Sequence, residues 1–367
     1  MVDFKGHVER TVELMVSGGL RALVVMGGSN IHYLVGSDAP SAVVVRDDGS
    51  LKTISTRLEY TRTLDEARLG EHYALSRGEE VADFERVVEG DLHEALARLL
   101  ADVGGGKVGC VSLPAELREK LSSAVGLELA DVTRGFLALR RRKDRSELEA
   151  LRSAARIAEQ ALLKAVGALE RGVTEAEVAA VIVSAMLRAG SRPAFPPIVA
   201  FGEHAAHPHA QPTLRPLRRG DVVKVDLGAR VEGYCSDITR TFVYGSTDGG
   251  LREALSAVLK AQEESIARIG PGVPAREVHQ YASRVLREHG LLRYFNHGLG
   301  HGVGLDVHEE PYLNSRSDTV LQQGDVITVE PGVYVWGKFG VRVEDMVLIT
   351  PGGPDVITTF PRLYELG

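Results

Sequence analysis

The alternation of apolar and polar positions predicts two strands of the same design in the second half of the chain. Residues 219–231 read RGDVVKVDLGARV and residues 323–335 read QGDVITVEPGVYV, at a constant offset of 104 residues as from Gly220 to Gly324. Each copy opens on a Gly-Asp turn signal and continues as a β-branched run, which is typical of a strand. The repeat therefore predicts an internal duplication.

One carboxylate interrupts each of these apolar runs, Asp226 in the first copy and Glu330 in the second. An ionised carboxylate in an apolar strand is unfavourable unless it is paired or bound to a metal ion. Each run leads through a turn into a second strand that carries a further acid, Asp237 or Glu344. We expect a first turn centred on residues 231–232 to place Asp226 directly opposite Asp237, and Glu330 to face Glu344 in the same sense. Facing acids repel each other, so a cation is expected between them.

Residues 1–140 alternate helical and strand patterns, which predicts an α/β unit with a mixed sheet. The expected helices are 4–16, 81–100 and one that begins at Pro114, and the expected strands are 22–26, 42–46, 51–55 and 107–111. Residues 28–36, GSNIHYLVG, are expected to form a loop.

The basic run at 140–143 is interpreted as a solvated flank between two domains, residues 1–140 and 141–367. In the second domain, helical patterns at 146–169 and 175–189 precede the first acid-bearing hairpin, and patterns at 251–269 and 275–289 precede the second. This order predicts a duplicated α+β domain, with its site where the two hairpins meet.

Two histidine-bearing segments accompany these hairpins. Residues 296–311, NHGLGHGVGLDVHEEP, are too rich in glycine for a stable helix, but they let the backbone pass close to a ligand. The histidines of this segment are expected to belong to a site, and they are His297, His301 and His308. The Pro-rich loop at 196–212 carries three more, His204, His207 and His209, of which at most one is expected to contribute.

Four carboxylates carry a charge near −4, which two divalent cations would balance. Oxygen ligands with one imidazole suit Mn, Co, Fe or Zn, and Mn or Co fits best. Two such ions about 3.5–4 Å apart can activate a water and polarise a carbonyl. The predicted reaction class is metal-assisted hydrolysis.

Bulk properties exclude several other classes. The 367 residues carry a net charge of −7, which argues against nucleic acid as a partner. The two cysteines, Cys110 and Cys235, are far apart in the sequence and are expected to be reduced thiols of a cytoplasmic protein. No secretory signal is recognised at the start, and no apolar run approaches the roughly 20 residues that a membrane helix needs.

Taken together, the motifs resemble the dinuclear pita-bread metallopeptidases, which include prolidase, aminopeptidase P and methionine aminopeptidase. The motifs that carry the resemblance are DLG (226–228), SDITRT (236–241), GHGVGLDVHE (300–309), EPG (330–332) and VRVED (341–345). The segment NIHYLVG (30–36) is similar to the creatinase-type domain that precedes the catalytic domain in prolidases and aminopeptidases P.

This resemblance implies a pita-bread fold and a role for each matching residue. The implied metal ligands are Asp226, Asp237, His301, Glu330 and Glu344, with Asp237 and Glu344 bridging the ions. The implied substrate-binding and catalytic residues are His209 and His308, which stabilise the tetrahedral intermediate, the pocket residue His297, and Arg342 beside Glu344. Arg342 also lies two residues from Glu344 and so shares its strand face. His207 occupies a position where many relatives carry an apolar residue, and its role is open.

The function expected from the resemblance is hydrolysis of Xaa-Pro bonds. An activated water attacks the carbonyl, His308 or His209 stabilises the oxyanion, and Glu330 carries the proton to the prolyl nitrogen. A short N-terminal domain favours a dipeptidase, while an aminopeptidase P acting on longer peptides stays open. A catalytically silent binding protein of this fold would typically lack metal ligands, and none is missing. The resemblance also implies a homodimer.

Overall fold

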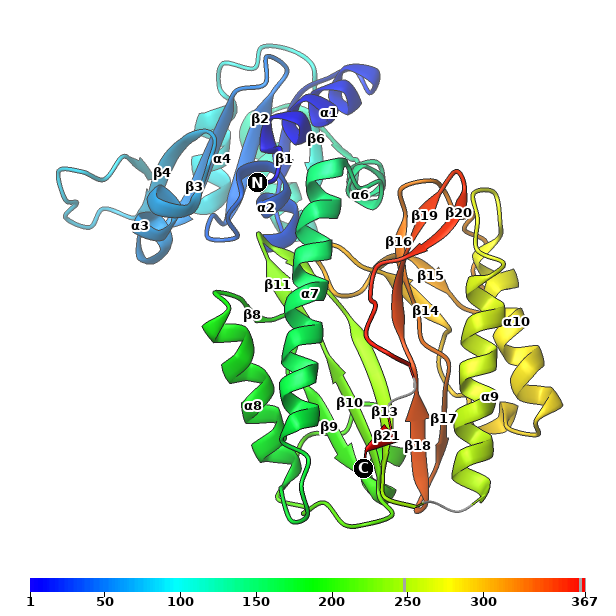
Figure 1. The fold of residues 1–367 in the computed structure, drawn as a ribbon. Helices are drawn as coiled ribbons and strands as arrows, with labels where there is room; N and C mark the ends of the chain where they lie inside the picture. The colour runs from blue at the N-terminus through cyan, green and yellow to red at the C-terminus, as the bar shows by residue number, and fades with distance from the viewer. Residues whose placement is uncertain (247–248, 363–364, 367) are drawn as a thin grey trace. The chain divides into compact units, whose positions relative to one another are not determined.

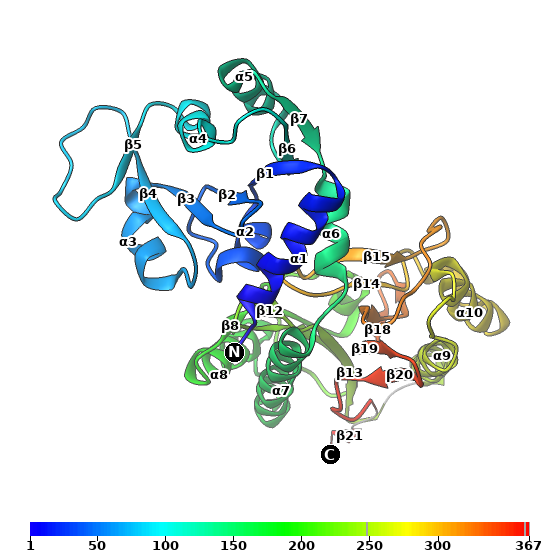
Figure 2. The ribbon, with the colours of Figure 1, turned by 90° about the horizontal axis from the view of Figure 1, so that it is seen from above.

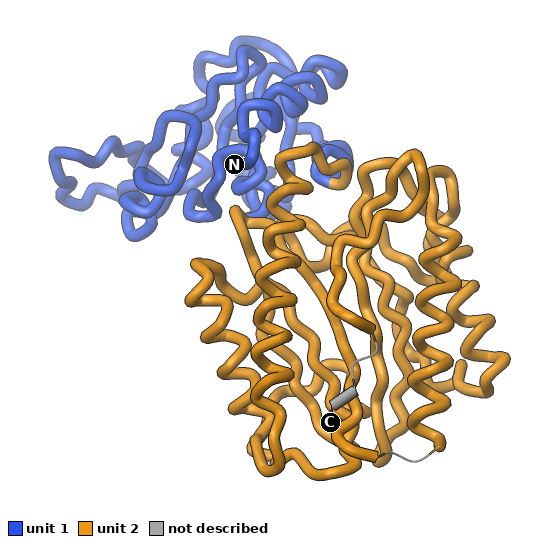
Figure 3. The backbone as a smooth tube through the Cα atoms, viewed as in Figure 1, with its two compact units in different colours: residues 1–140 blue, residues 141–367 orange. Residues whose placement is uncertain are grey.

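The chain divides into two compact units, residues 1–140 and residues 141–367 (Figure 3). The computed structural model describes residues 1–246, 249–362 and 365–366. Within the described residues, no helix is both long and apolar enough to cross a membrane. Cys110 and Cys235 are buried and free.

A mixed sheet forms the centre of the first unit, as the pattern predicts (Figure 1). Its strand order is β5-β4-β3-β2-β1-β6-β7, and β2 pairs antiparallel with both β1 and β3. The strands are β1 (Leu20–Val25), β2 (Ala42–Arg46), β3 (Leu51–Thr56), β4 (Glu71–Ser76), β5 (Val87–Glu89), β6 (Lys107–Val111) and β7 (Glu128–Asp131). The helices are α1 (Phe4–Ser17), α2 (Gly28–Val35), α3 (Arg57–Glu66), α4 (Leu92–Leu100), α5 (Ala115–Val125) and α6 (Thr133–Arg141).

Two predictions for this unit are wrong. The helix expected at 81–100 is divided into strand β5 and helix α4, because Gly90 has a φ of 108° and Asp91 begins α4 with a capping box to Glu94. The loop expected at 28–36 is helix α2, which ends at Gly36 in a left-handed conformation. In both cases a glycine marks the boundary of the element.

The second unit contains the duplication that the sequence predicts. Helices α7 (Arg145–Gly167) and α8 (Glu175–Arg188) precede β10 (Val222–Leu227) and β13 (Ile238–Tyr244). Helices α9 (Gly249–Ile266) and α10 (Ala275–Glu288) precede β16 (Val326–Val329) and β19 (Asp345–Thr350). In Figures 1 and 2, α7 and α8 flank the strands on one side, and α9 and α10 flank them on the other.

Shorter strands complete the sheets of this unit. The strand orders are β21-β13-β10-β9, β12-β11-β8, β15-β14-β16-β19-β20 and β17-β18. The remaining strands are β8 (Arg192–Pro193), β9 (Ile198–Phe201), β11 (Ala229–Val231), β12 (Tyr234–Cys235), β14 (Gly300–Gly302), β15 (Glu309–Leu313), β17 (Gly332–Val335), β18 (Phe339–Arg342), β20 (Gly353–Val356) and β21 (Glu365–Leu366). Two short 3-10 helices are η1 (Gly202–Ala206) and η2 (Leu292–Tyr294).

Strand β10 shows how the core directs polar groups toward the site. Val223 and Val225 pack into the apolar cluster formed with α7 and α8. Because side chains alternate along a strand, Lys224 and Asp226 point to the opposite face. Both are buried there.

The register of the first hairpin differs from the prediction. Asp226 pairs with Thr239 rather than with Asp237, because the chain turns at Glu232 and Gly233, whose φ values are 47° and 86°. A shift of two residues keeps the side chains on one face, so Asp226 and Asp237 are diagonal neighbours. In the second hairpin, Gly332 pairs with Arg342 and Val329 with Asp345 in a single register. That register sets Glu330 opposite Glu344, as predicted.

The basic run at 140–143 is not a solvated flank. The Arg141 guanidinium donates to both carboxylate oxygens of buried Asp325, at 2.7 and 2.5 Å. The ammonium of Lys143, itself buried, donates to Oε1 of Glu309 at 2.5 Å. Lys143 is buried and Arg141 is partly buried, because each has a carboxylate partner, whereas Arg142 is exposed.

The glycine at position 300 allows two strands to approach closely, which predicts that Gly300→Ala destabilises the protein. A Cβ at Gly300 would clash with the carbonyl oxygen of Thr328 in the neighbouring strand. We expect a loss of about 1–3 kcal/mol in the free energy of unfolding, measured by urea titration. Gly167→Ala is the matched control, because a Cβ there meets nothing and alanine favours the helix. Equal effects of the two substitutions would contradict this account.

Candidate active site

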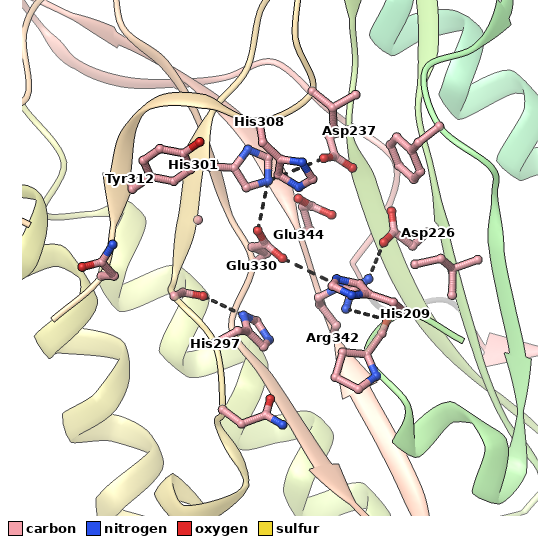
Figure 4. A pocket seen from close by; sticks show the side chains of 18 of the residues that line it. His209, Asp226, Asp237, His297, His301, His308, Tyr312, Glu330, Arg342 and Glu344 are labelled. Carbon is pink, nitrogen blue, oxygen red and sulfur yellow. Dashed lines mark hydrogen bonds and ion pairs between the residues drawn. The ribbon is translucent and has the colours of Figure 1, made fainter. Parts of the chain in front are cut away.

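A cavity of about 750 Å³ in the second unit is lined by every residue that the sequence analysis assigned to the site (Figure 4). Its lining includes Asp226, Asp237, His301, Glu330, Glu344, His209, His297, His308 and Arg342. These residues come from both halves of the duplication and from the two histidine-bearing segments. The fold therefore brings together side chains that are more than 130 residues apart in the sequence.

Asp237, His301 and Glu344 form the tightest group in this cavity. Each offers one ligand atom, and these atoms all lie within 4.8 Å of one another. All three side chains are buried. Nε2 of His301 lies 3.8 Å from Oδ2 of Asp237 and 3.2 Å from Oε1 of Glu330. Two carboxylates and an imidazole at this separation have the donor atoms that a divalent transition metal ion prefers.

Two carboxylate oxygens at the site are available for a cation. One oxygen of Asp226 accepts from Nη2 of Arg342, and Oε2 of Glu344 accepts from Oγ1 of Thr239 at 2.7 Å. The other oxygens, Oδ1 of Asp226 and Oε1 of Glu344, are buried and have no hydrogen-bond partner among the residues that the structure describes. A buried carboxylate oxygen without a partner is costly. A metal ion would remove that cost, so the residues present fit a metal centre.

The electrostatics of the cavity also favour added positive charge. Burial, together with repulsion from Glu344 and Asp226, raises the pKa of Asp237 well above its ordinary value. Burial and repulsion from Glu330 and Asp226 do the same to the pKa of Glu344. Although burial opposes it, the hydrogen bond with His301 lowers the pKa of Glu330 to about 2. Thus the carboxylates cannot all ionise easily unless a cation is bound.

Arg342 connects several of these groups. Its guanidinium donates to Asp226, to the hydroxyl of Tyr334 at 2.8 Å and to Oγ1 of Thr239 at 3.0 Å. Its Nε lies 3.9 Å from Oε2 of Glu330. The side chain thus orients two candidate ligands from outside the tightest group.

The histidines differ in how they are held. Nδ1 of His301 lies 3.0 Å from the carbonyl oxygen of Gly302, which leaves Nε2 toward the carboxylates. His308 is exposed to the cavity, and its ring centre lies 4.2 Å from that of His301. Burial lowers the pKa of His308 and of His297. Neutral imidazoles are therefore favoured at both positions.

Two of the three histidines in the Pro-rich loop line the cavity, of which the sequence analysis expects at most one to contribute. His207 and His209 both line the cavity. His204 does not line it, and its Nδ1 lies 2.8 Å from Oε1 of Glu175, a buried carboxylate at the start of α8.

Several polar residues near the site were missed by the sequence analysis. Tyr312 lines the cavity, and Tyr334 bridges Arg342 and His297, whose Nε2 lies 3.1 Å from the tyrosine hydroxyl. Tyr312 lies in the segment after His308 and gives no pattern of its own. Lys224 did give a signal, because it interrupts the same apolar run as Asp226.

Comparisons with known proteins agree with this geometry. Residues 149–351 match the model of metallopeptidase family M24, and residues 7–142 match the Creatinase/Prolidase N-terminal domain. The chain belongs to metallopeptidase family M24. This membership identifies the second unit as a metallopeptidase domain of the pita-bread type that the motifs suggested, and it implies divalent metal ions as cofactors.

Among its M24 relatives, the chain is 33% identical to the Xaa-Pro dipeptidase of Pyrococcus furiosus over 98% of this chain and 99% of that protein. The solved Xaa-Pro dipeptidase of Bacillus anthracis has a TM-score of 0.87 at 29% identity and covers 99% of this chain and 100% of its own. The solved X-Pro aminopeptidase of Thermotoga maritima has a TM-score of 0.84 at 30% identity, and the match covers 98% of this chain and 99% of that protein.

The raised pKa values predict that the metal-free protein loses stability as the pH rises. Asp237 and Glu344 hold their protons more tightly in the folded state than in the unfolded chain. Their contribution to the stability of the fold is therefore complete below their pKa values in the unfolded chain, which lie near 4, and it is lost as the pH rises. Glu330 has a lowered pKa in the folded state, so its contribution to the stability of the fold is lost only as the pH falls toward about 2. We therefore expect the Tm of the metal-free protein to fall between about pH 5 and about pH 8.

Glu344→Gln is the control for this titration, because it removes one of the two groups and weakens the repulsion on Asp237. Its Tm should fall less over the same range, and Mn²⁺ should raise the wild-type Tm most at high pH, where protons compete least. An equal fall in both proteins would show that other groups cause the pH dependence.

Proposed function

We propose that this protein is a metal-dependent Xaa-Pro dipeptidase. The observation that carries the proposal is the complete group of five candidate ligands around one cavity, in a chain that matches Xaa-Pro dipeptidases over nearly its whole length. The substrate class comes from those relatives. The hydrolytic chemistry is supported by the buried carboxylates and by the histidines beside them.

In this proposal, Asp226, Asp237, His301, Glu330 and Glu344 would hold two divalent ions, and Asp237 and Glu344 would serve as ligands to both. Mn or Co suits the oxygen-rich ligands with one imidazole, and Zn or Fe is also compatible. When bound, the ions would polarise the scissile carbonyl and lower the pKa of water.

The protein's own side chains are proposed to bind the substrate and move the proton. Glu330 accepts the proton of the attacking water and delivers it to the prolyl nitrogen. His308 and His209 face the cavity and donate hydrogen bonds to the developing oxyanion. His297, held by Gly298 and Tyr334, shapes the pocket wall, and Arg342 holds Asp226 and Glu330 in place.

The main alternative is an Xaa-Pro aminopeptidase that acts on longer peptides. It is favoured by the likeness to the X-Pro aminopeptidase of Thermotoga maritima. A catalytically silent binding protein is disfavoured, because all five candidate ligands are present and line one cavity.

We further propose a homodimer located in the cytoplasm, without a nucleic-acid or membrane partner. The cytoplasmic location is supported by the two free, buried cysteines. The net charge of −7 supports the expectation that nucleic acid is not a partner.

Glu344→Ala should abolish metal binding and hydrolysis together. Loss of a residue that merely orients a metal ligand typically costs about 10- to 100-fold, so loss of a proposed bridging ligand should cost at least about 100-fold in kcat/KM. Metal content and hydrolysis of an Xaa-Pro dipeptide should be measured on the same preparation. Glu253→Ala, at an exposed position on α9, is the control and should keep both. A Glu344→Ala protein with full activity would refute the proposed ligand role.

Substrate length separates the two peptidase proposals. With Mn²⁺ or Co²⁺ added, we expect a higher kcat/KM for an Xaa-Pro dipeptide than for an Xaa-Pro-Xaa tripeptide or a longer peptide. The reverse preference would identify an aminopeptidase. No hydrolysis of either substrate, in protein that binds two ions per chain, would remove the Xaa-Pro assignment.

A further inference from the structure

Lys224 is a completely buried lysine to which the candidate metal centre gives no role. It lies in β10, two residues before Asp226 and on the same face. Its ammonium donates to the carbonyl oxygens of Ala205 at 2.9 Å, His207 at 2.6 Å and Pro208 at 3.3 Å. Three acceptors match the three N–H donors of an ammonium group. Burial and the nearby Arg342 lower the pKa of Lys224, whereas Asp226 opposes this shift.

The three carbonyls belong to the segment that leads directly into His209. We call residues 205–209 the histidine loop. Two further contacts hold it against β18: Pro208 accepts from Nη1 of Arg342 at 3.2 Å, and Ala205 packs so closely on Gly340 that a Cβ at Gly340 would clash. Lys224 thus joins the histidine loop to the strand that carries Asp226.

The duplication provides an independent parallel. At the offset of 104 residues, the counterpart of Lys224 is Thr328, two residues before Glu330. Oγ1 of Thr328 accepts from the backbone N–H of His301 at 3.1 Å and lies 3.4 Å from Oε1 of Glu330. In both copies, a polar side chain two residues before a carboxylate holds a segment that carries a cavity histidine. Lys224 donates hydrogen bonds and Thr328 accepts one, but the two side chains occupy equivalent positions in the duplication.

We propose that Lys224 is a positioning residue that fixes the histidine loop so that His209 faces the cavity. This inference rests on the proposed peptidase function, because His209 acts on the substrate there. Lys224 donates hydrogen bonds only to backbone carbonyls, and its Nζ also lies 5.0 Å from the ring centre of Tyr334. It makes no contact with substrate in this account. Its effect on the reaction passes through His209.

Lys224→Met tests the proposal with little change in side-chain length. Methionine fills the buried space but removes the Lys224 donor from three carbonyls, of which Pro208 keeps the donor from Arg342, so the loop should leave its position or admit water. In the metal-free protein, amide hydrogen exchange of a peptide that covers residues 202–212 should increase. This readout depends neither on bound metal nor on activity.

Steady-state kinetics then test whether the effect of Lys224 on hydrolysis depends on His209. We expect Lys224→Met to lower kcat/KM for an Xaa-Pro dipeptide by about 10- to 100-fold, the cost of a misplaced catalytic group. In a His209→Ala background, the same substitution should cost less than about threefold, because the group that it misplaces is already gone. Lys224→Arg, which keeps a cation with several N–H donors, should recover part of the activity.

Val223→Ala is the matched control for lost stability. Val223 is the neighbouring residue of the same strand, equally buried, and packs into the α7 and α8 core on the other face. It should lower the Tm without changing kcat/KM or the exchange of residues 202–212. If Lys224→Met does not fold, Lys224→Gln, which keeps two N–H donors, takes its place with the same expectations.

Unchanged exchange in residues 202–212, or equal fold losses in the wild-type and His209→Ala backgrounds, would overturn the positioning role. Failure of the proposed function looks different, since the wild-type protein itself would then not hydrolyse Xaa-Pro peptides. In that case the exchange measurement still decides whether Lys224 holds the loop.

Discussion

Repulsion among buried carboxylates is the constraint on which the second unit depends. Asp226, Asp237 and Glu344 are buried, and Asp226 raises the cost of ionising both Asp237 and Glu344, while Glu344 raises that of Asp237. A fold that buries several acids around one cavity must supply positive charge or keep protons on them. Here Arg342 binds one of them, which leaves further negative charge for cations to balance. The duplicated hairpins are the device that brings these acids together, since neither copy contains enough ligands alone.

The rest of the site can be understood as support for that cluster. Arg342 and Tyr334 form a chain of hydrogen bonds from Asp226 to His297. Thr239 holds Glu344, and glycine at position 300 lets the strand that carries His301 pass close to its neighbour. Each of these supports crosses from one half of the duplication to the other, or from a strand to a histidine-bearing segment. Cavity geometry therefore depends on contacts that a single strand pair could not provide.

Much of this arrangement could be predicted from the sequence, because a single acidic residue inside an apolar strand pattern indicates a buried carboxylate. Asp226 and Glu330 stand out in this way, and the offset of the repeat links them. The register of the first hairpin was less predictable, since a turn shifted by one residue, at Glu232 and Gly233, moves the pairing by two positions. Residues such as Tyr334 lie in patterns that are ordinary for a strand. Their role depends on tertiary contacts that periodicity does not encode.

The central claim is that the buried acids form a centre for two cations, and titration calorimetry of the metal-free protein with Mn²⁺ tests it most directly. Measured near neutral pH in buffers of different ionisation enthalpy, binding should saturate at two ions per chain. It should also release protons, and more of them as the pH is lowered, because Asp237 and Glu344 bind protons more tightly than free carboxylates and lose them when a cation binds. Saturation at one ion or fewer, or binding without proton release, would contradict the account.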